Sequence, residues 1–428
     1  MPVVLYLERH ECHAGTGKGL TNSNFDIVPP MSKLPPELWR NIFSLAVNEP
    51  ISFLREWDSR YWAPPAATDM RMKLTICRVC RLFHGIGTEL LYTHIYFPRH
   101  SFDGIDKIAT VFERHQHEVG YAYGRATKRI DIWAECLESR LEVLPLLRLL
   151  KLVQNLVVLA FRTYTFSTTI PIFDPSALSQ VSRLLEQRFK HCFKCLALCI
   201  SLSSLYGKVL PEIPLHMLEL AMVPCHLDPH PCTTNVTSLI LNLLLWPEEN
   251  DPLMWHFPSL KSLTLRSMTV SDMPRLEPFF QLHGQHIMFL NILYFKGQRN
   301  VDHITHFLKV CPRIHHFSFP STFLLYHEEL NGGVWGPQIF SGVNTVSIEH
   351  FRSWSWSASI FRTIHKVFPN LERIRHTFND RGIEPGALRL MRRLEASGIK
   401  MEPVLIGEPT LASEDILADC MPGLLSEV

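Results

Sequence analysis

The sequence predicts an α/β protein in which a group of N-terminal helices is followed by an irregular solenoid of short strands and helices. Two observations predict this fold. A short helical segment near the start of the chain carries apolar residues on more than one side, and much of the remaining chain repeats a single apolar pattern. With 428 residues, the chain can bury one large core or two to three smaller ones.

The first helix is predicted to begin at Leu34-Pro35-Pro36-Glu37 and to end before Pro50. Proline fits the first turn because its missing N–H has no helical partner there, and Glu37 lies near the positive end of the helix dipole. Two apolar rows run along this helix: Leu38, Ile42 and Leu45 in one, and Trp39, Phe43 and Ala46 in the other. One neighbouring element cannot cover both rows, so we expect another protein to hold this helix.

A second helical stretch is predicted from Thr68 to Phe97. Asp69 is expected to cap its first helix, and Gly85 is expected to end that helix in a left-handed conformation. The stretch contains the strings Val-Cys-Arg-Leu-Phe at 79–83 and Glu-Leu-Leu-Tyr at 89–92.

These strings, together with residues 34–43, resemble the F-box, the helical module that docks F-box proteins onto the Skp-family adaptor of SCF-type ubiquitin ligases. The large F-box families of fungi are the most similar. Two features depart from the pattern. About twenty residues, 49–68, are inserted between the halves, and Phe83 stands where many members have tryptophan.

The resemblance implies that this region binds the Skp-family adaptor and, through it, a cullin. It assigns the following residues to the F-box fold and its adaptor face: Leu34, Pro35, Leu38, Ile42, Phe43, Val79, Cys80 and Leu82. The chain would then be a non-catalytic subunit of a ligase, with no enzyme activity and no cofactor of its own.

Beyond the helices, the chain repeats a unit of an apolar residue, two variable ones, an apolar one, a variable one and an apolar one. The units begin at Leu156, Phe193, Leu215, Val236, Leu260, Leu290, Ile314 and Val343. Successive differences are 37, 22, 21, 24, 30, 24 and 29 residues, which resemble the spacing of leucine-rich repeats. Each unit predicts a short strand, and a strand with its return segment must stack on its neighbours to bury its apolar side.

Other features of this region fit the same interpretation. Three units begin with a similar proline-containing turn, at 257–260, 311–314 and 368–371. Helices are expected at 301–310, 360–367 and 386–396, weaker units at Ile95 and Ile130, and a closing strand at 399–406. The asparagine or cysteine that closes a regular repeat is missing, so we expect an irregular horseshoe without a buried asparagine ladder.

We therefore divide the chain into four regions: a flexible leader at 1–32, the F-box-like domain at 33–97, the solenoid at 98–406 and a flexible acidic tail at 407–428. Residues between the inward apolar positions of the solenoid should line a common concave surface. They are Arg162, Glu219, Thr264, Arg266, Tyr294, Lys296, Ser318, Ser347, Glu349 and Arg375. Because aromatic and arginine side chains supply much of the energy at interfaces, Arg266, Tyr294, Lys296 and Arg375 are the candidates for binding a protein target.

The composition excludes several classes of function. Lys plus Arg number 42 and Asp plus Glu number 41, which argues against a main role on nucleic acid or on an acidic membrane. The eleven cysteines are scattered through apolar stretches, so we expect a reducing compartment, cytoplasmic or nuclear. The most hydrophobic window, 141–161, contains Glu142, Arg148 and Lys151 and is not expected to span a membrane.

Two other classes of function remain open. One is a scaffold that binds the adaptor without any ligase. The other is a zinc enzyme built around Cys225, His226, His230 and Cys232, which lie in a proline-rich loop. Two further sets, Cys77-Cys80-His84 and Cys192-Cys195-Cys199, lack a second pair of ligands at a suitable distance. We expect them to be packing residues, and we assign no metal ligand.

Overall fold

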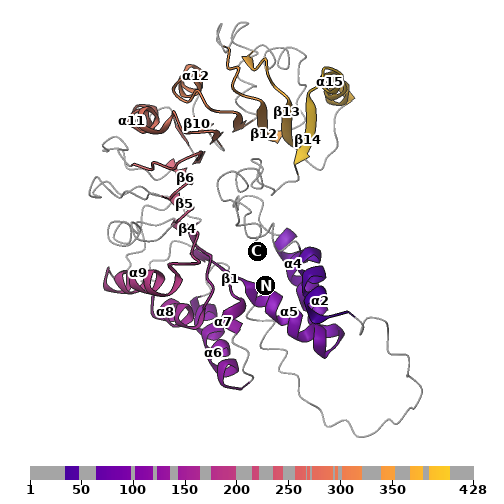
Figure 1. Cartoon of the computed structure of the whole chain (residues 1–428), viewed down its shortest axis with the longest axis vertical. Coiled ribbons are helices and arrows are strands. Elements are labelled where there is room, and N and C mark those ends of the chain that lie inside the picture. The colour runs from indigo at the N-terminus through magenta and orange to yellow at the C-terminus, as the bar shows by residue number, and fades with distance from the viewer. Residues whose placement is uncertain are drawn as a thin grey trace, which may run out of the picture. The chain divides into compact units, whose positions relative to one another are not determined.

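The computed structural model shows an α/β protein made of two compact units. It describes residues 34–47, 64–97, 102–118, 123–134, 143–163, 175–198, 215–220, 235–243, 256–266, 268–269, 272–292, 295–296, 301–320, 339–351, 367–378 and 385–404. The first unit holds the elements from α2 to α9, and the second holds those from β4 to β14 (Figure 1). The predicted division of the chain at residue 97 stays a prediction.

Three helices open the first unit: α2 (Pro36–Ala46), α4 (Pro64–Val79) and α5 (Arg81–Thr93). As predicted, α2 has a proline in its first turn, and it ends well before Pro50. The buried residues Val47, Ile76 and Phe83 form a small core. Trp39 and Phe43 pack on this core, and the centres of their rings lie 4.9 and 4.8 Å from that of Phe83.

Two predicted features of the second and third helices are wrong. α4 already begins at Pro64, because two prolines suit a first helical turn, so Asp69 lies inside the helix and does not cap it. The break before α5 falls at Cys80, whose backbone is extended (φ −160°, ψ 172°) and whose sulfur accepts a hydrogen bond from the Phe83 N–H. Gly85 therefore lies inside α5 and ends no helix.

A glycine allows α4 and α5 to approach closely. A Cβ atom at Gly87 would lie 2.7 Å from Cys77 Sγ and 2.9 Å from the Cys77 backbone nitrogen. An ion pair adds a polar contact between α2 and α5, since Arg40 Nη2 lies 2.9 Å from Glu89 Oε2. The three helices thus form one small bundle.

The rest of the first unit combines three parallel strands with four helices. The strands are β1 (His94–Phe97), β2 (Arg129–Ala134) and β3 (Val158–Thr163). The helices are α6 (Phe102–Glu118), α7 (Tyr123–Ala126), α8 (Val143–Leu152) and α9 (Pro175–Phe189). Ile95 pairs with Ile130, and Ile130 pairs with Leu159, so the weaker units predicted at Ile95 and Ile130 are confirmed as strands.

A buried charge network connects β1 to β2. Arg129 donates to Asp131 through Nε at 2.6 Å and through Nη2 at 3.0 Å, and His94 Nε2 lies 2.5 Å from Asp131 Oδ2. Burial opposes ionisation of Asp131, but Arg129 and His94 hold the pKa of that carboxyl below its usual range. Burial lowers the pKa of His94. All three polar groups are therefore satisfied in an apolar environment.

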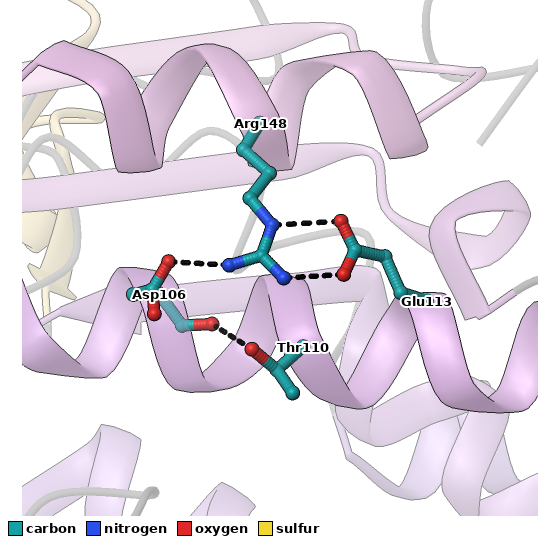
Figure 2. Close-up of polar contacts among 4 residues, drawn as sticks. All are labelled: Asp106, Thr110, Glu113 and Arg148. Atoms are coloured by element: carbon teal, nitrogen blue, oxygen red, sulfur yellow. Dashed lines mark hydrogen bonds and ion pairs between the residues drawn. The ribbon is translucent and has the colours of Figure 1, made fainter.

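On the surface of this unit, Arg148 of α8 clamps two carboxylates of α6 (Figure 2). Its Nη1 lies 2.6 Å from Asp106 Oδ1, its Nε lies 2.7 Å from Glu113 Oε1, and its Nη2 contacts the second oxygen of Glu113. The hydrogen bonds to Glu113 and Asp106 raise the pKa of the guanidinium. The clamp is solvent-exposed, so it orients the two helices more than it stabilises them.

Among the described residues, the second unit contributes nine strands to the main parallel sheet, and they follow the order of the chain. They are β4 (Cys195–Leu198), β5 (Met217–Leu220), β6 (Ser238–Asn242), β7 (Ser262–Arg266), β9 (Phe289–Ile292), β11 (His316–Pro320), β12 (Thr345–Phe351), β13 (Arg373–Phe378) and β14 (Lys400–Val404). One apolar residue of each strand pairs with its counterparts to form a row, which is fully buried from β5 to β13: Leu218, Leu239, Leu263, Leu290, Phe317, Val346 and Ile374.

The predicted position of one repeat is wrong by three residues. The pairing of Leu290 with Leu263 and Phe317 shows that this unit begins at Ile287 and not at Leu290. Leu290 fits both alignments of the pattern, and the sheet selects the one that also buries Ile287. The aligned leucine, leucine and phenylalanine are then separated by 27 residues each, since 290 − 263 = 27 and 317 − 290 = 27.

Helices and aromatic side chains complete the second unit. α11 (Met273–His283) follows the short strand β8 (Met268–Thr269), α12 (Val301–Val310) precedes β11, and α15 (Pro385–Ala396) precedes β14. The predicted helices at 301–310 and 386–396 and the predicted closing strand are therefore confirmed. Residues 360–366, where a further helix was predicted, lie outside the described residues. Phe280 of α11 and Phe307 of α12 are fully buried and stacked with their ring centres 4.1 Å apart.

Main-chain hydrogen bonds from the preceding repeat lie at the start of most strands of the second unit. The three predicted proline turns are confirmed, because the N–H groups of Leu260, Ile314 and Leu371 each donate to the carbonyl three residues earlier. One carbonyl before most strands then accepts two N–H groups of the next repeat, as the Lys261 carbonyl accepts those of Met288 and Phe289. This ladder of backbone hydrogen bonds connects neighbouring repeats in place of the missing asparagine ladder.

Candidate functional site

The first candidate site is a set of apolar side chains that the small helical bundle leaves exposed. They are Leu34, Leu38, Ile42, Leu45, Val79 and Leu82, which we call the apolar set. Leu38 is 46% exposed, Ile42 44% and Leu45 69%, and α2 contains no fully buried residue. The three follow each other at i, i+4 and i+7, so they share one side of α2. The first predicted row thus faces solvent, and Trp39 and Phe43 of the second row cover the core.

The structure places the eight predicted adaptor-binding residues as follows. Seven are exposed, and Phe43 is half-buried against Phe83. Val79, Cys80 and Leu82 lie together at the junction of α4 and α5, where the backbone of Cys80 is extended. Exposed aliphatic residues that recur along a short helix are unfavourable in water.

The second candidate site is a row of mostly polar residues on the sheet of the second unit. It consists of Thr264, Asn291, Ser318, Ser347, Arg375 and Glu402, which we call the polar row. Each member follows an apolar row residue directly, so its side chain points to the opposite face of the sheet. Thr264, Ser318, Ser347 and Arg375 were predicted to share a surface, and their register confirms that they do.

Four of the six members of the polar row, Thr264, Asn291, Ser318 and Ser347, are deeply buried, whereas Arg375 and Glu402 are partly exposed. Asn291, Ser318 and Ser347 are 0% exposed. Ser347 Oγ lies 2.8 Å from His316 Nε2, but the Asn291 amide and the Ser318 hydroxyl have no hydrogen-bond partner in the described part of the chain. A buried polar group without a partner costs about 1 to 3 kcal/mol, so these residues are not there for stability alone.

Charged residues gather at the end of the polar row. Lys400 Nζ lies 2.6 Å from Glu402 Oε1, Arg375 Nε lies 3.3 Å from Oε2, and Arg373 Nε lies 3.5 Å from Oε1. Partial burial opposes ionisation of Glu402, but these cations hold its pKa below the usual range. Burial, together with Arg375, His315 and Arg373, lowers the pKa of His316 to about 3, so its ring is neutral at physiological pH.

The four predicted target-binding residues have different outcomes. Arg375 lies in the polar row. Arg266 lies on β7, where its Nη1 is 2.5 Å from Oε1 of Glu219, another predicted surface residue. Lys296 was also predicted to line the common surface of the main sheet, and that placement is wrong, because β10 (Phe295–Lys296) pairs with β8 (Met268–Thr269) in a separate two-stranded sheet. Target binding by Lys296 stays a prediction. Tyr294 lies outside the described residues.

Asn291, His316 and Glu402 were missed by the sequence reasoning. The shift of three residues in the β9 repeat hid Asn291, and regular 27-residue spacing was the signal that could have revealed it. Arg162, also predicted to line the concave surface, lies on β3 in the first unit, and Glu349 lies on β12 opposite Pro320.

The predicted zinc residues Cys225, His226, His230 and Cys232 lie outside the described residues. Within the described ranges, no three His, Cys, Asp or Glu side chains are grouped to hold a metal ion. Cys77 lies 3.9 Å from the Thr88 hydroxyl, and Cys192 donates to the Leu156 carbonyl. None of the described helices combines the length and apolar character that crossing a bilayer requires.

Comparison with known proteins finds similarity among solved structures alone. No protein-family model matches the chain, and no curated protein matches it either. Among solved structures, the leucine-rich repeat-containing protein LegL7 from Legionella pneumophila aligns with 71% of this chain and 98% of its own, at 12% sequence identity and a TM-score of 0.38. This similarity is too weak to carry an argument about function.

Proposed function

We propose that this chain is the target-recognition subunit of an SCF-type ubiquitin ligase, in which the helices α2, α4 and α5 bind the Skp-family adaptor and the repeats bind a protein target. The observation that carries the proposal is the exposed apolar set on a segment that resembles an F-box. The cullin would be engaged through the adaptor, and no residue of this chain would take part in ubiquitin chemistry.

The apolar set can supply part of the binding free energy of a specific interface. Burying a half-exposed leucine or isoleucine gains on the order of 1 kcal/mol, so the six apolar residues supply about 6 kcal/mol before association costs. A micromolar complex needs about 8 kcal/mol of net binding free energy. Hydrogen bonds and further apolar contacts from the adaptor must supply the rest.

In this arrangement the chain accelerates ubiquitin transfer by proximity. A target held on the repeats keeps its lysine near the ubiquitin carried by a separate conjugating enzyme, which makes an encounter between two molecules effectively intramolecular. The parallel sheet of the second unit supports this role because it offers a continuous surface of paired strands for a target.

The test is the binding of purified chain to a purified Skp-family adaptor, measured by surface plasmon resonance. Leu38→Asp and Ile42→Asp are each expected to weaken binding at least about tenfold, because a carboxylate must be desolvated in an apolar contact. Leu282→Asp is the matched control, since Leu282 is 44% exposed on α11 in the second unit. It should bind like the wild type.

Two results would overturn the proposal: wild-type chain that does not bind the adaptor, or Leu38→Asp that binds as tightly as Leu282→Asp. Circular dichroism of each variant shows that the helices are intact. A complex that contains adaptor but no cullin would instead favour the scaffold alternative.

A further inference from the structure

Four exposed cations lie at the C-terminal ends of three helices in the first unit. Arg125 lies in the last turn of α7, Lys151 in that of α8 and Arg188 in that of α9, and Lys190 directly follows α9. We call these four residues the basic patch. Residues 123–192 contain ten lysines and arginines and six acidic residues, so their net charge is +4, since 10 − 6 = 4, whereas that of the whole chain is +1.

Close packing brings the end of α7 against the end of α8. A Cβ atom at Gly124 would clash with the carbonyl oxygen of Leu152, so a glycine permits this approach. The next residue, Arg125, donates from Nε to Gln154 Oε1 at 3.1 Å, and its carbonyl accepts a hydrogen bond of 2.9 Å from the Asn155 amide. These contacts hold Arg125 beside the segment that leaves α8.

Two further hydrogen bonds bring the end of α9 to the end of α8. The Arg188 guanidinium donates from Nη1 to the main-chain carbonyl of Lys151, in the last turn of α8. Two residues after Lys190, the Cys192 thiol donates to the Leu156 carbonyl at 3.4 Å. The cations of three successive helices therefore lie along one edge of the first unit.

The described residues do not neutralise the basic patch. Arg125 and Arg188 donate to an amide oxygen and to a carbonyl, and none of the four cations forms an ion pair with a carboxylate in the described ranges. A cation in the last turn of a helix interacts favourably with the helix dipole, but one cation per helix suffices for this effect. It does not explain Lys190 or the approach of four like charges. The surplus of positive charge is complementary to an anion from another molecule.

We propose that the basic patch docks an acidic segment of a partner protein. Its carboxylates would form charge-assisted hydrogen bonds with several lysine and arginine side chains at once. Nucleic acid fits the surface less well, because single strands are held largely by stacking on aromatic side chains. The three helices contain only two aromatic residues: Phe189 is 0% exposed, and Tyr123 is stacked on Tyr92 with the ring centres 4.8 Å apart.

This inference goes beyond the proposed function and does not depend on it, because neither the apolar set nor the polar row contributes a residue to the basic patch. The test is the fluorescence anisotropy of a labelled peptide of about ten glutamates, which is about 33 Å long when extended and therefore exceeds the width of two neighbouring helices. The full chain should bind this peptide. Lys151→Glu with Lys190→Glu should weaken binding at least about tenfold, because two attractive contacts become repulsive.

A matched control separates the basic patch from helix ends in general. Lys309 lies in the last turn of α12 and Arg313 in the turn that follows, and both are exposed. Lys309→Glu with Arg313→Glu makes the same change of charge at equivalent positions outside the patch, so binding should change less than about twofold. Circular dichroism shows whether each variant is folded. A second pair, Lys151→Gln with Lys190→Gln, adds no carboxylate to the patch and should weaken binding about threefold.

Each of three outcomes contradicts the proposal. The first is a wild-type chain that does not bind the glutamate peptide. The second is equal weakening in the two charge-reversal variants, which would show that the peptide responds to net charge and not to the basic patch. The third is a single-stranded RNA of about ten nucleotides that binds the wild type more tightly than the peptide does and is lost in Lys151→Glu with Lys190→Glu. That result would make the basic patch a site for nucleic acid.

Discussion

The bundle of α2, α4 and α5 exposes apolar side chains, whereas the strands of the second unit bury polar ones. The bundle leaves Leu38, Ile42 and Leu45 exposed beside a core that contains the buried residues Val47, Ile76 and Phe83. The strands bury their apolar row completely and, on the opposite face, also bury the polar side chains of Asn291 and Ser318. Both departures reduce the stability of the chain by itself, and each coincides with the surface at which we infer binding.

The largest expected difference in the free energy of unfolding is between a substitution at a buried phenylalanine and one at an exposed leucine. Phe307→Ala removes a fully buried ring that stacks on Phe280 and should lower the free energy of unfolding by about 3 to 5 kcal/mol. Leu45→Ala, at a residue 69% exposed, should change it by less than about 0.5 kcal/mol. Chemical denaturation measures both. Equal losses would show that the bundle is not under-packed as described.

Substitutions at two glycines of α5 test how closely α4 and α5 pack. Gly87→Ala places a Cβ 2.7 Å from Cys77 Sγ and should cost up to about 3 kcal/mol, because α4 and α5 must move apart. Gly85→Ala has no atom within 4 Å of the new Cβ and should gain up to about 1 kcal/mol of helix propensity. Thermal unfolding compares the pair. A destabilised Gly85→Ala would contradict its position inside the helix.

The next prediction concerns how the stability of the second unit depends on pH. Unfolded His316 takes up a proton near pH 6.5, whereas the folded residue does so only near pH 3. Its contribution to stability is therefore complete above pH 6.5 and falls as the pH drops towards 3, by about 2 kcal/mol at pH 5. His316→Gln should reduce the loss of stability between pH 7.5 and pH 5 by this amount. An unchanged pH dependence would place the ring in a less buried environment.

The smallest effect compares two serines that pair on adjacent strands. Ser347→Ala breaks the 2.8 Å contact with His316 and should cost about 1 kcal/mol. Ser318→Ala removes a buried hydroxyl without a partner in the described residues and should be neutral or stabilise the chain by up to about 1 kcal/mol. Opposite signs in denaturation curves support the polar row as described. Equal losses would show that Ser318 is satisfied in solution.

Much of the strand content could be predicted from the sequence because each strand carries an alternating apolar signal. The proline turns at 257–260, 311–314 and 368–371 were predictable for a similar reason, since proline and the following apolar residue fix the local backbone. The alignment of the apolar pattern in the repeat that contains β9 was not predictable in this way. Leu290 satisfies two alignments of the pattern, and only pairing with Leu263 and Phe317 distinguishes them.

The candidate sites show the same limit. The apolar set followed from helical periodicity, because Leu38, Ile42 and Leu45 share one side of a helix whatever it packs against. The polar row depends on pairing between residues that are 27 to 29 positions apart in sequence, and neither Asn291 nor Glu402 stands out locally. The end of α4 at Cys80 was hidden as well, since a cysteine supplied the break expected from Gly85.

The backbone ladder between repeats has a consequence for how this sequence can vary. Its donors and acceptors are peptide groups, such as the carbonyl of Lys261 and the N–H groups of Met288 and Phe289, so almost any amino acid supplies them. Side chains at these positions therefore do not need to form hydrogen bonds between neighbouring turns. A stack of repeats held together by backbone hydrogen bonds tolerates substitutions that would disrupt repeats held together by one asparagine side chain. Its repeats can therefore differ widely in amino-acid sequence and keep the same fold.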